Sequence, residues 1–135
     1  MDSKIRHLEF IQQTILRMAS NSFLLKGWTV TIVVGIFVFA NPKEIDSKYL
    51  FSVLIPILFF WLLDGFFLHQ EKLFRKLYDK VRVTLEEDID FSMNTSLIQK
   101  DVDSWIKVTV SKTLSLFYFP LLLVVLLAIY FAYLF

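Results

Sequence analysis

Three apolar runs dominate the chain, and each is long enough to form a helix that crosses a bilayer. They cover residues 23–40, 49–68 and 113–135. A helix rises about 1.5 Å per residue, so about 20 apolar residues cross the hydrocarbon layer. The pattern predicts three transmembrane helices. The first is long enough only if Lys26 lies at the membrane edge, where its stem reaches water.

Residues 1–22, in front of the first run, have the pattern of an amphipathic helix. Their apolar residues recur at helical spacing, at Ile5, Leu8, Ile11, Ile15, Met18 and Ala19. We expect a cytoplasmic helix that continues directly into the first span. Its apolar face either packs against the helix that leaves the second span or lies on the bilayer surface.

The second run passes into a basic amphipathic helix without a Gly-Pro break. Its apolar residues again recur at helical spacing, at Phe74, Leu77, Tyr78, Val81 and Leu85. The acidic residues 86–90 indicate a solvated helix end. A second short amphipathic helix is predicted to start at Asn94 or Thr95 and to run through Ile106. These elements make residues 69–112 a cytoplasmic helical segment.

Proline and aromatic residues predict where the spans end and bend. Asn41-Pro42 ends the first helix, because the residue before proline is disfavoured in the α region. Residues 41–48 then form an external loop. Pro56 removes one backbone hydrogen bond and predicts a kink in the second span. The third run carries no charge, so we expect it to face lipid, with interfacial aromatics at Tyr118, Tyr130 and Tyr133.

The composition and the charge distribution agree with this topology. Hydrophobic residues make up 56% of the chain, more than a soluble domain carries. Of the 14 Lys and Arg residues only Lys43 and Lys48 lie in the 41–48 loop. The positive-inside rule then places the N-terminus in the cytoplasm and the C-terminus outside a bacterial inner membrane. The predicted fold is an all-α membrane protein whose first two spans extend into the cytoplasm as a long helical hairpin.

Asp64 lies inside the second apolar run, where an isolated carboxylate is costly. In an antiparallel hairpin centred on Ile45, Lys26 and Asp64 fall at similar depth. We therefore expect them to form an ion pair, which is either structural or part of a gate. With Thr29 and Thr31 they are the candidates for a pore lining or gate. Gly27, Thr31 and Gly35 form a face of small residues that favours close helix packing.

Several kinds of chemistry are not expected from this composition. The chain has no Cys, three Gly and two His, and no catalytic motif stands on a plausible rigid site. We expect no enzyme, no cofactor and no metal site. Binding, oligomerisation and effects on the membrane remain.

Basic residues on the predicted cytoplasmic helices favour phosphate binding. They are Arg6, Arg17, Lys72, Arg75, Lys76, Lys80 and Arg82. Two kinds of partner fit them. One is the anionic headgroups of the bilayer. The other is a nucleotide or oligonucleotide signal held where several copies of the chain converge.

Two stretches resemble small prokaryotic membrane proteins that occur with antiviral defence genes. They are RMASNSFLLKGW at 17–28, and WLLDGFFL at 61–68 with EKLFRKLY at 71–78. The layout of roughly the first 85 residues is similar to that of SLATT-type effectors, which usually have two spans; this chain has a third. The resemblance implies a membrane hairpin with cytoplasmic helices that perforates the membrane once a nucleotide-based sensor fires. A partner nucleotidyltransferase or another sensor would supply the signal.

The leading hypothesis is a homo-oligomeric inner-membrane effector of antiviral defence that forms a gated ion pore and depolarises the membrane. A nucleotide-type signal at the basic cytoplasmic layer would control it. The alternative is a non-conducting membrane anchor or accessory protein that assembles a cytoplasmic partner.

Overall fold

The computed structural model describes residues 2–39 and 51–134, and in these residues it contains helices and turns but no strand. Three long helices are α1 (Asp2–Phe39), α3 (Leu54–Arg82) and α5 (Lys112–Leu134). Three short ones are η1 (Glu86–Asp88), η2 (Ser96–Asp101) and α4 (Trp105–Thr109). The three long helices are each apolar enough to cross a membrane. The predicted all-α fold with three spans is therefore confirmed.

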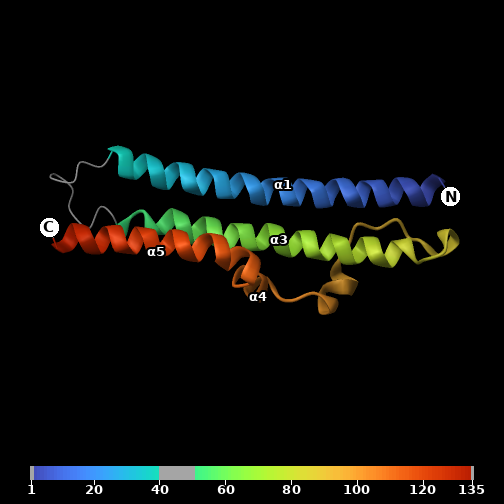
Figure 1. Cartoon of the computed structure of the whole chain (residues 1–135). Helices are drawn as coiled ribbons and strands as arrows, with labels where there is room; N and C mark the ends of the chain where they lie inside the picture. Colours follow the sequence, from blue (N-terminus) through green and yellow to red (C-terminus); the bar gives the residue numbers. More distant parts are fainter. Residues whose placement is uncertain (1, 40–50, 135) are drawn as a thin grey trace.

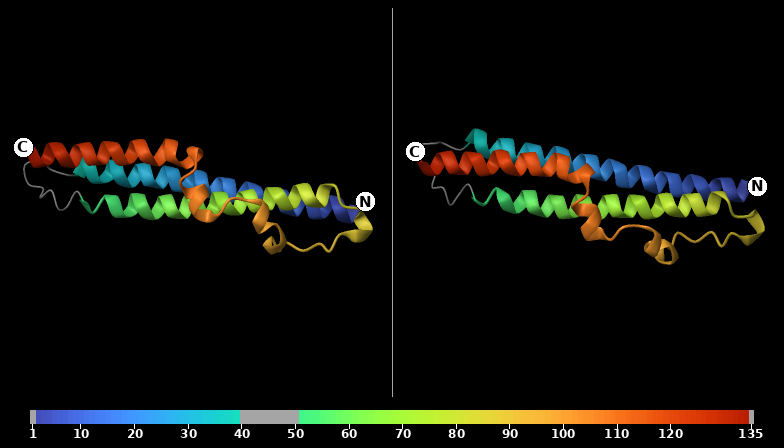
Figure 2. Two further views of the ribbon diagram at one scale, coloured as in Figure 1. Left: turned by 90° about the horizontal axis from the view of Figure 1, so that it is seen from below. Right: turned by 60° about the horizontal axis from the view of Figure 1, so that its bottom comes forward.

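The long helices divide the molecule into two parts along one axis (Figures 1 and 2). At one end α1, α3 and α5 lie side by side; at the other end α1 and α3 continue without α5. We call this second part, residues 2–22 of α1 and 69–82 of α3, the stalk. Residues 83–104, which we call the strap, run back along it toward the spans. The N-terminal helix and the first span are one helix, as predicted.

Each part has its own apolar core. Between the spans the core consists of Val33, Val53, Ile57, Leu114, Tyr118, Val125 and Ile129. In the stalk it consists of Ile11, Ile15, Leu77 and Val81, with Ile98 of the strap packed against them. The apolar stripe of the N-terminal segment thus packs on α3, as one of its two interpretations required. Ile5, at the edge of that stripe, remains 49% exposed.

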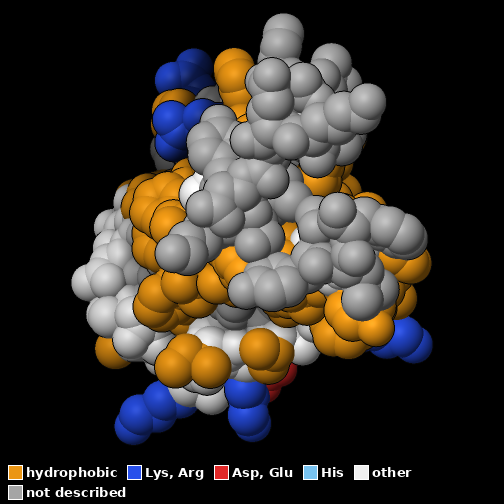
Figure 3. Space-filling view, turned by 90° about the vertical axis from the view of Figure 1, so that its left-hand side faces the viewer, with side chains coloured by type: hydrophobic (Ala, Val, Ile, Leu, Met, Phe, Trp, Pro, Cys, Tyr) orange, Lys and Arg blue, Asp and Glu red, His pale blue; other side chains and the backbone are white. Residues whose placement is uncertain are grey.

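The surface of the spans is largely apolar. Large side chains on α5 are exposed, among them Leu116, Phe119, Val124 and Leu127. Figure 3 looks at the end of the molecule where α5 ends; hydrophobic side chains cover most of its coloured surface, and Lys and Arg lie at its margins. This distribution is the one expected of helices surrounded by lipid.

The predicted kink at Pro56 is wrong. Helix α3 begins at Leu54, so Pro56 stands in the first turn, where backbone N–H groups have no partner within the helix. The missing donor costs no hydrogen bond there. The predicted stop at Asn41-Pro42 and the 41–48 loop lie outside the described residues.

The short amphipathic helix expected from Asn94 or Thr95 through Ile106 is also not as predicted. The segment from Asn94 to Ile106 forms η2 and α4, separated by an extended residue at Val102. Side chains bind the backbone N–H two residues ahead at three successive places: Asp90 to Ser92, Ser92 to Asn94 and Asn94 to Ser96. These local bonds compete with helix formation. Ser104 then caps α4 by accepting from the Lys107 N–H.

Candidate functional site

A single carboxylate, Asp64 of α3, joins all three long helices. Its side chain is fully buried. Lys26 of α1 donates from Nζ to Oδ2 at 2.6 Å, and the Tyr118 hydroxyl of α5 donates to the same oxygen at 2.9 Å. Ser22 of α1 donates from Oγ to Oδ1. We call these four residues the Asp64 cluster.

Helix geometry explains how α1 supplies two of the donors. Ser22 and Lys26 are four residues apart, so their side chains lie on the same face one turn apart. Lys26 Nζ also donates to Ser22 Oγ at 2.9 Å. The Lys26 side chain keeps 24% of its exposure, and its ammonium lies 5.9 Å from the centre of the Phe117 ring. The cation is thus paired with Asp64 at one side and partly exposed at the other.

Tyr118 is fixed in position from both sides. Its ring stacks on that of Trp61 at 5.6 Å between centroids and 7° between planes. It also meets Phe117 edge to face. The predicted interfacial role of Tyr118 is wrong, because its side chain is fully buried. It is the polar contact through which α5 reaches Asp64.

The Asp64 cluster confirms the predicted Lys26–Asp64 ion pair. A carboxylate in hydrocarbon is tolerated when its oxygens are paired and hydrogen-bonded, and here both oxygens accept. The register around Ile45 also holds at the far end of the stalk, where Lys4 Nζ donates to the Thr84 carbonyl at 2.8 Å. Ser22 and Tyr118 were not predicted. The spacing of Ser22 four residues before Lys26 was the available signal.

Just beside the cluster, the short helix α4 is held against α3 by a close approach at Gly65. A Cβ at Gly65 would lie 2.0 Å from Thr109 Oγ1 and 3.0 Å from Thr109 Cα. Two indole N–H groups tie the helices together: Trp61 donates to the Thr109 carbonyl at 2.7 Å, and Trp105 to the Leu62 carbonyl at 3.1 Å. This contact positions the start of α5, and nothing in the sequence pattern indicated it.

The two threonines proposed for a pore lining lie on different sides of α1. Thr29 is fully buried and donates to the Leu25 carbonyl at 2.6 Å. Thr31 is exposed and donates to the Gly27 carbonyl at 2.8 Å. In this conformation Thr29 faces the core of the chain, with Asp64, and Thr31 faces outward.

The predicted face of small residues is not used within the described chain. A Cβ added at Gly27 or Gly35 would meet no atom within 4 Å. The close packing expected at this face therefore does not occur against α3 or α5. The face remains free for another helix.

The predicted basic residues do not form one positive surface. Lys72, Arg75 and Lys76 line a groove of about 320 Å³, but Asp79, Asp101 and Asp103 line it too. Arg75 is paired with Glu71 at 2.9 Å. Three carboxylates thus balance the three cations of this groove. Of the other predicted residues, Lys80 lines a separate groove under the strap, and Arg6 and Arg82 are exposed.

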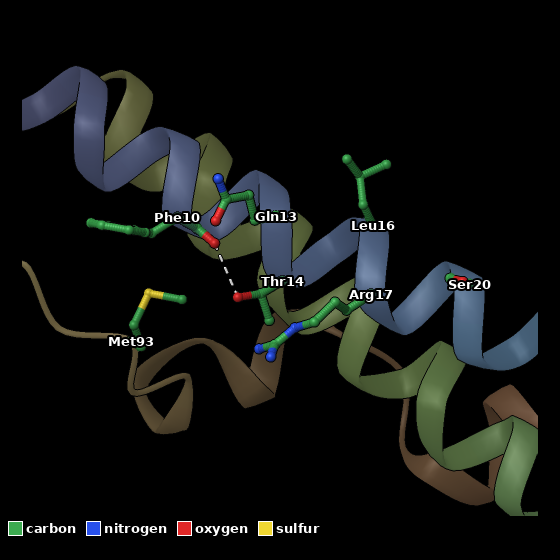
Figure 4. A pocket seen from close by; sticks show the side chains of 7 residues that line it. All are labelled: Phe10, Gln13, Thr14, Leu16, Arg17, Ser20 and Met93. Atoms are coloured by element: carbon green, nitrogen blue, oxygen red, sulfur yellow. Dashed lines mark hydrogen bonds between the residues drawn. The ribbon is translucent and has the colours of Figure 1, made fainter.

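Arg17 lies in a different groove, formed by α1 and the strap (Figure 4). The groove has a volume of about 700 Å³ and is lined by Phe10, Gln13, Thr14, Leu16, Arg17, Ser20 and Met93. In Figure 4 the side chains of Phe10, Thr14, Arg17 and Met93 face a common space, and Leu16 points away from it. Of the described residues that line this groove, Arg17 alone is charged.

Comparison with protein-family models, curated protein sequences and solved structures finds no match to this chain. What the chain does must therefore be inferred from the geometry of its own sites.

Proposed function

We propose that the protein is a homo-oligomeric effector in a bacterial inner membrane, which forms a gated ion pore and depolarises the cell. The observation that carries this proposal is the Asp64 cluster. Ionisable residues inside spans are costly, and they commonly mark ion paths or proton relays. Here one carboxylate binds donors from the other two spans, so loss of its hydrogen bonds would remove the polar link between all three helices.

The pore would require several copies of the chain. Three helices with a packed core leave no passage within one copy, since Thr29 and Asp64 are fully buried. The free face at Gly27 and Gly35 offers α1 a surface for close packing with another copy. In this proposal the described conformation is closed, and opening breaks the Asp64 cluster and exposes Lys26, Thr29 and Asp64 to water.

The place of the protein in antiviral defence, and its control by a nucleotide-type signal, are proposals that rest on the SLATT-like layout. The proposed orientation, with the stalk in the cytoplasm, rests on the positions of Lys and Arg. A reporter enzyme fused after Phe135 tests it. Alkaline phosphatase, active only outside the inner membrane, should be active there and inactive when fused before Met1. The reverse result would contradict the orientation.

The membrane potential of bacteria that express the protein tests the gate. Replacing Tyr118 with Phe removes a hydrogen bond to a charged carboxylate, worth about 1.5–3 kcal/mol. The open state should then rise about tenfold or more in population. Cells with Tyr118→Phe should depolarise more strongly than cells with the wild-type chain, as measured with a voltage-sensitive dye.

Tyr130→Phe is the matched control, because Tyr130 is 59% exposed and lies on the same helix. It should leave the potential at the wild-type value. Equal potentials for Tyr118→Phe and Tyr130→Phe, at equal expression, would show that the Asp64 cluster does not gate a pore.

A second candidate function, that of a non-conducting anchor, is favoured by the strap. Val83 and Leu97 are 76% and 78% exposed there, beyond the apolar spans, which suits contact with a partner protein. This function predicts no change in potential for any of these variants.

A further inference from the structure

The Arg17 groove combines a cation that has no ion-pair partner among the described residues with an apolar platform. Arg17 is exposed and makes no ion pair with any residue in 2–39 or 51–134. No residue that lines the groove is acidic, in contrast to the groove at Lys72 and Arg75. A guanidinium in this setting is free to bind a phosphate with two parallel hydrogen bonds.

The position of Arg17 along the helix sets its distance from the bilayer. Tyr118 of α5 and Lys26 of α1 both bind Asp64, so they lie at about the same depth. Helix α5 begins at Lys112, and Tyr118 lies about 9 Å from Lys112 along the helix axis. Arg17 precedes Lys26 by nine residues, so it lies about 14 Å from Lys26 toward the stalk. If Lys112 marks the edge of the apolar layer, Arg17 lies about 5 Å outside it, at the level of the headgroups.

The apolar platform lies on the far side of Arg17 from the bilayer. Phe10 precedes Arg17 by seven residues, which is about 10 Å further from the apolar layer. Its ring is 58% exposed, and Met93 of the strap faces it across the groove. A phospholipid bound by its phosphate would need the opposite arrangement, with its apolar part toward the bilayer. The groove therefore fits a soluble compound better than a lipid.

We propose that this groove binds a nucleotide. The phosphate would bind Arg17, and the base would lie between the Phe10 ring and the Met93 thioether. Gln13 lines the same groove, but its amide points away from the space between Phe10 and Met93. The Thr14 hydroxyl is already used, since it donates to the Phe10 carbonyl at 3.0 Å.

This inference rests on the proposed control by a nucleotide-type signal. It places the binding site at Arg17 and not at the basic layer of Lys72, Arg75 and Lys76. The groove at Lys72, Arg75 and Lys76 is electrically balanced by its own carboxylates, so it has little excess charge to offer a phosphate. The Arg17 groove also joins two elements, α1 and the strap. A bound nucleotide would bridge Phe10 of α1 and Met93 of the strap.

Isothermal titration calorimetry of the full chain tests the site. The chain is placed in nanodiscs of phosphatidylcholine, which carry no anionic lipid, and titrated with ribonucleoside mono- and triphosphates and with inorganic phosphate. We expect saturable binding of at least one nucleotide. Arg17→Gln and Phe10→Ala should each weaken that binding about tenfold or more, through loss of the phosphate contact and of the stacked base.

The controls are Arg6→Gln, which removes the same charge elsewhere on α1, and Ile5→Ala, which shortens an exposed apolar side chain of α1 outside the groove. Both should bind as the wild type does. Because Arg17 and Phe10 are exposed, all four variants should keep the wild-type helical content by circular dichroism.

Three results would overturn the inference: no nucleotide of the panel binds, Arg17→Gln binds as tightly as the wild type, or inorganic phosphate binds as tightly as any nucleotide. A lipid site would appear instead as phosphatidylglycerol that copurifies with the wild type and is lost in Arg17→Gln, without nucleotide binding. The titration does not depend on conductance. If the chain binds a nucleotide but carries no current, the proposed pore is contradicted and the proposed nucleotide site still stands.

Discussion

Replacing Lys26 with Met is expected to destabilise the packing of the spans by about 3 kcal/mol, because it leaves the buried Asp64 carboxylate without its cation. Asp64→Asn should cost a similar amount, since it leaves the ammonium without its anion. The measurement is the midpoint of thermal or denaturant unfolding of the purified chain in detergent micelles.

The double variant Lys26→Met with Asp64→Asn separates an ion pair from two independent effects. Removing both charges together is often neutral, because the desolvation cost of each charge disappears with its attraction. We therefore expect the double variant to be clearly more stable than either single variant. If the two single losses instead add in the double variant, the two charges are not coupled and the cluster does not join the spans in the way described.

Replacing Gly65 with Ala is the second change expected to have a large effect. The added methyl carbon would lie 2.0 Å from Thr109 Oγ1 and 3.0 Å from Thr109 Cα, so α4 must move away from α3. Overpacking of this kind costs about 1–3 kcal/mol. The shift would also stretch the hydrogen bonds from Trp61 and Trp105. Unfolding midpoints and the fluorescence of these tryptophans measure the effect.

Gly27→Ala is the matched control on another helix. A Cβ there meets no atom within 4 Å, so the change should be neutral or stabilising by up to about 1 kcal/mol through helix propensity. Equal stability changes for Gly65→Ala and Gly27→Ala would contradict the close approach of α4. In a homo-oligomer packed through α1, Gly27→Ala should instead weaken assembly without unfolding the chain, which cross-linking measures.

The features that follow from one helix or one hairpin could be predicted from the sequence. Periodicity of apolar residues gave the long helices, and their antiparallel register placed Lys26 opposite Asp64. Both depend on regular helix geometry, in which depth follows directly from residue number. For the same reason the pairing of Ser22 with Asp64 was within reach, since Ser22 stands one turn from Lys26.

Features that depend on packing between distant segments could not be predicted. Tyr118 has the sequence context of an interfacial aromatic, and only the position of α5 beside α3 makes it a donor to Asp64. The close approach of Thr109 to Gly65 is of the same kind. In the strap, short polar side chains accept hydrogen bonds from nearby backbone N–H groups. These bonds compete with the backbone hydrogen bonds of a helix, so no continuous helix forms although the apolar residues keep helical spacing as far as Ile106.

The net charge of each groove also depends on packing between distant segments and could not be predicted. A count of basic residues along the helices predicted a positive layer that includes Lys72, Arg75 and Lys76. Folding brings Asp101 and Asp103 of the strap to that groove and balances it. Arg17, which the sequence analysis grouped with the other basic candidates, makes no ion pair with the described residues and lies beside Phe10 and Met93.

Recording of ionic current across a planar bilayer that contains the purified protein tests the proposed pore most directly. We expect discrete conductance steps, open for a larger fraction of time in Tyr118→Phe than in the wild type or Tyr130→Phe. The absence of current from all three, with each protein folded and inserted, would contradict the pore. It would leave the Asp64 cluster as a purely structural junction between three spans.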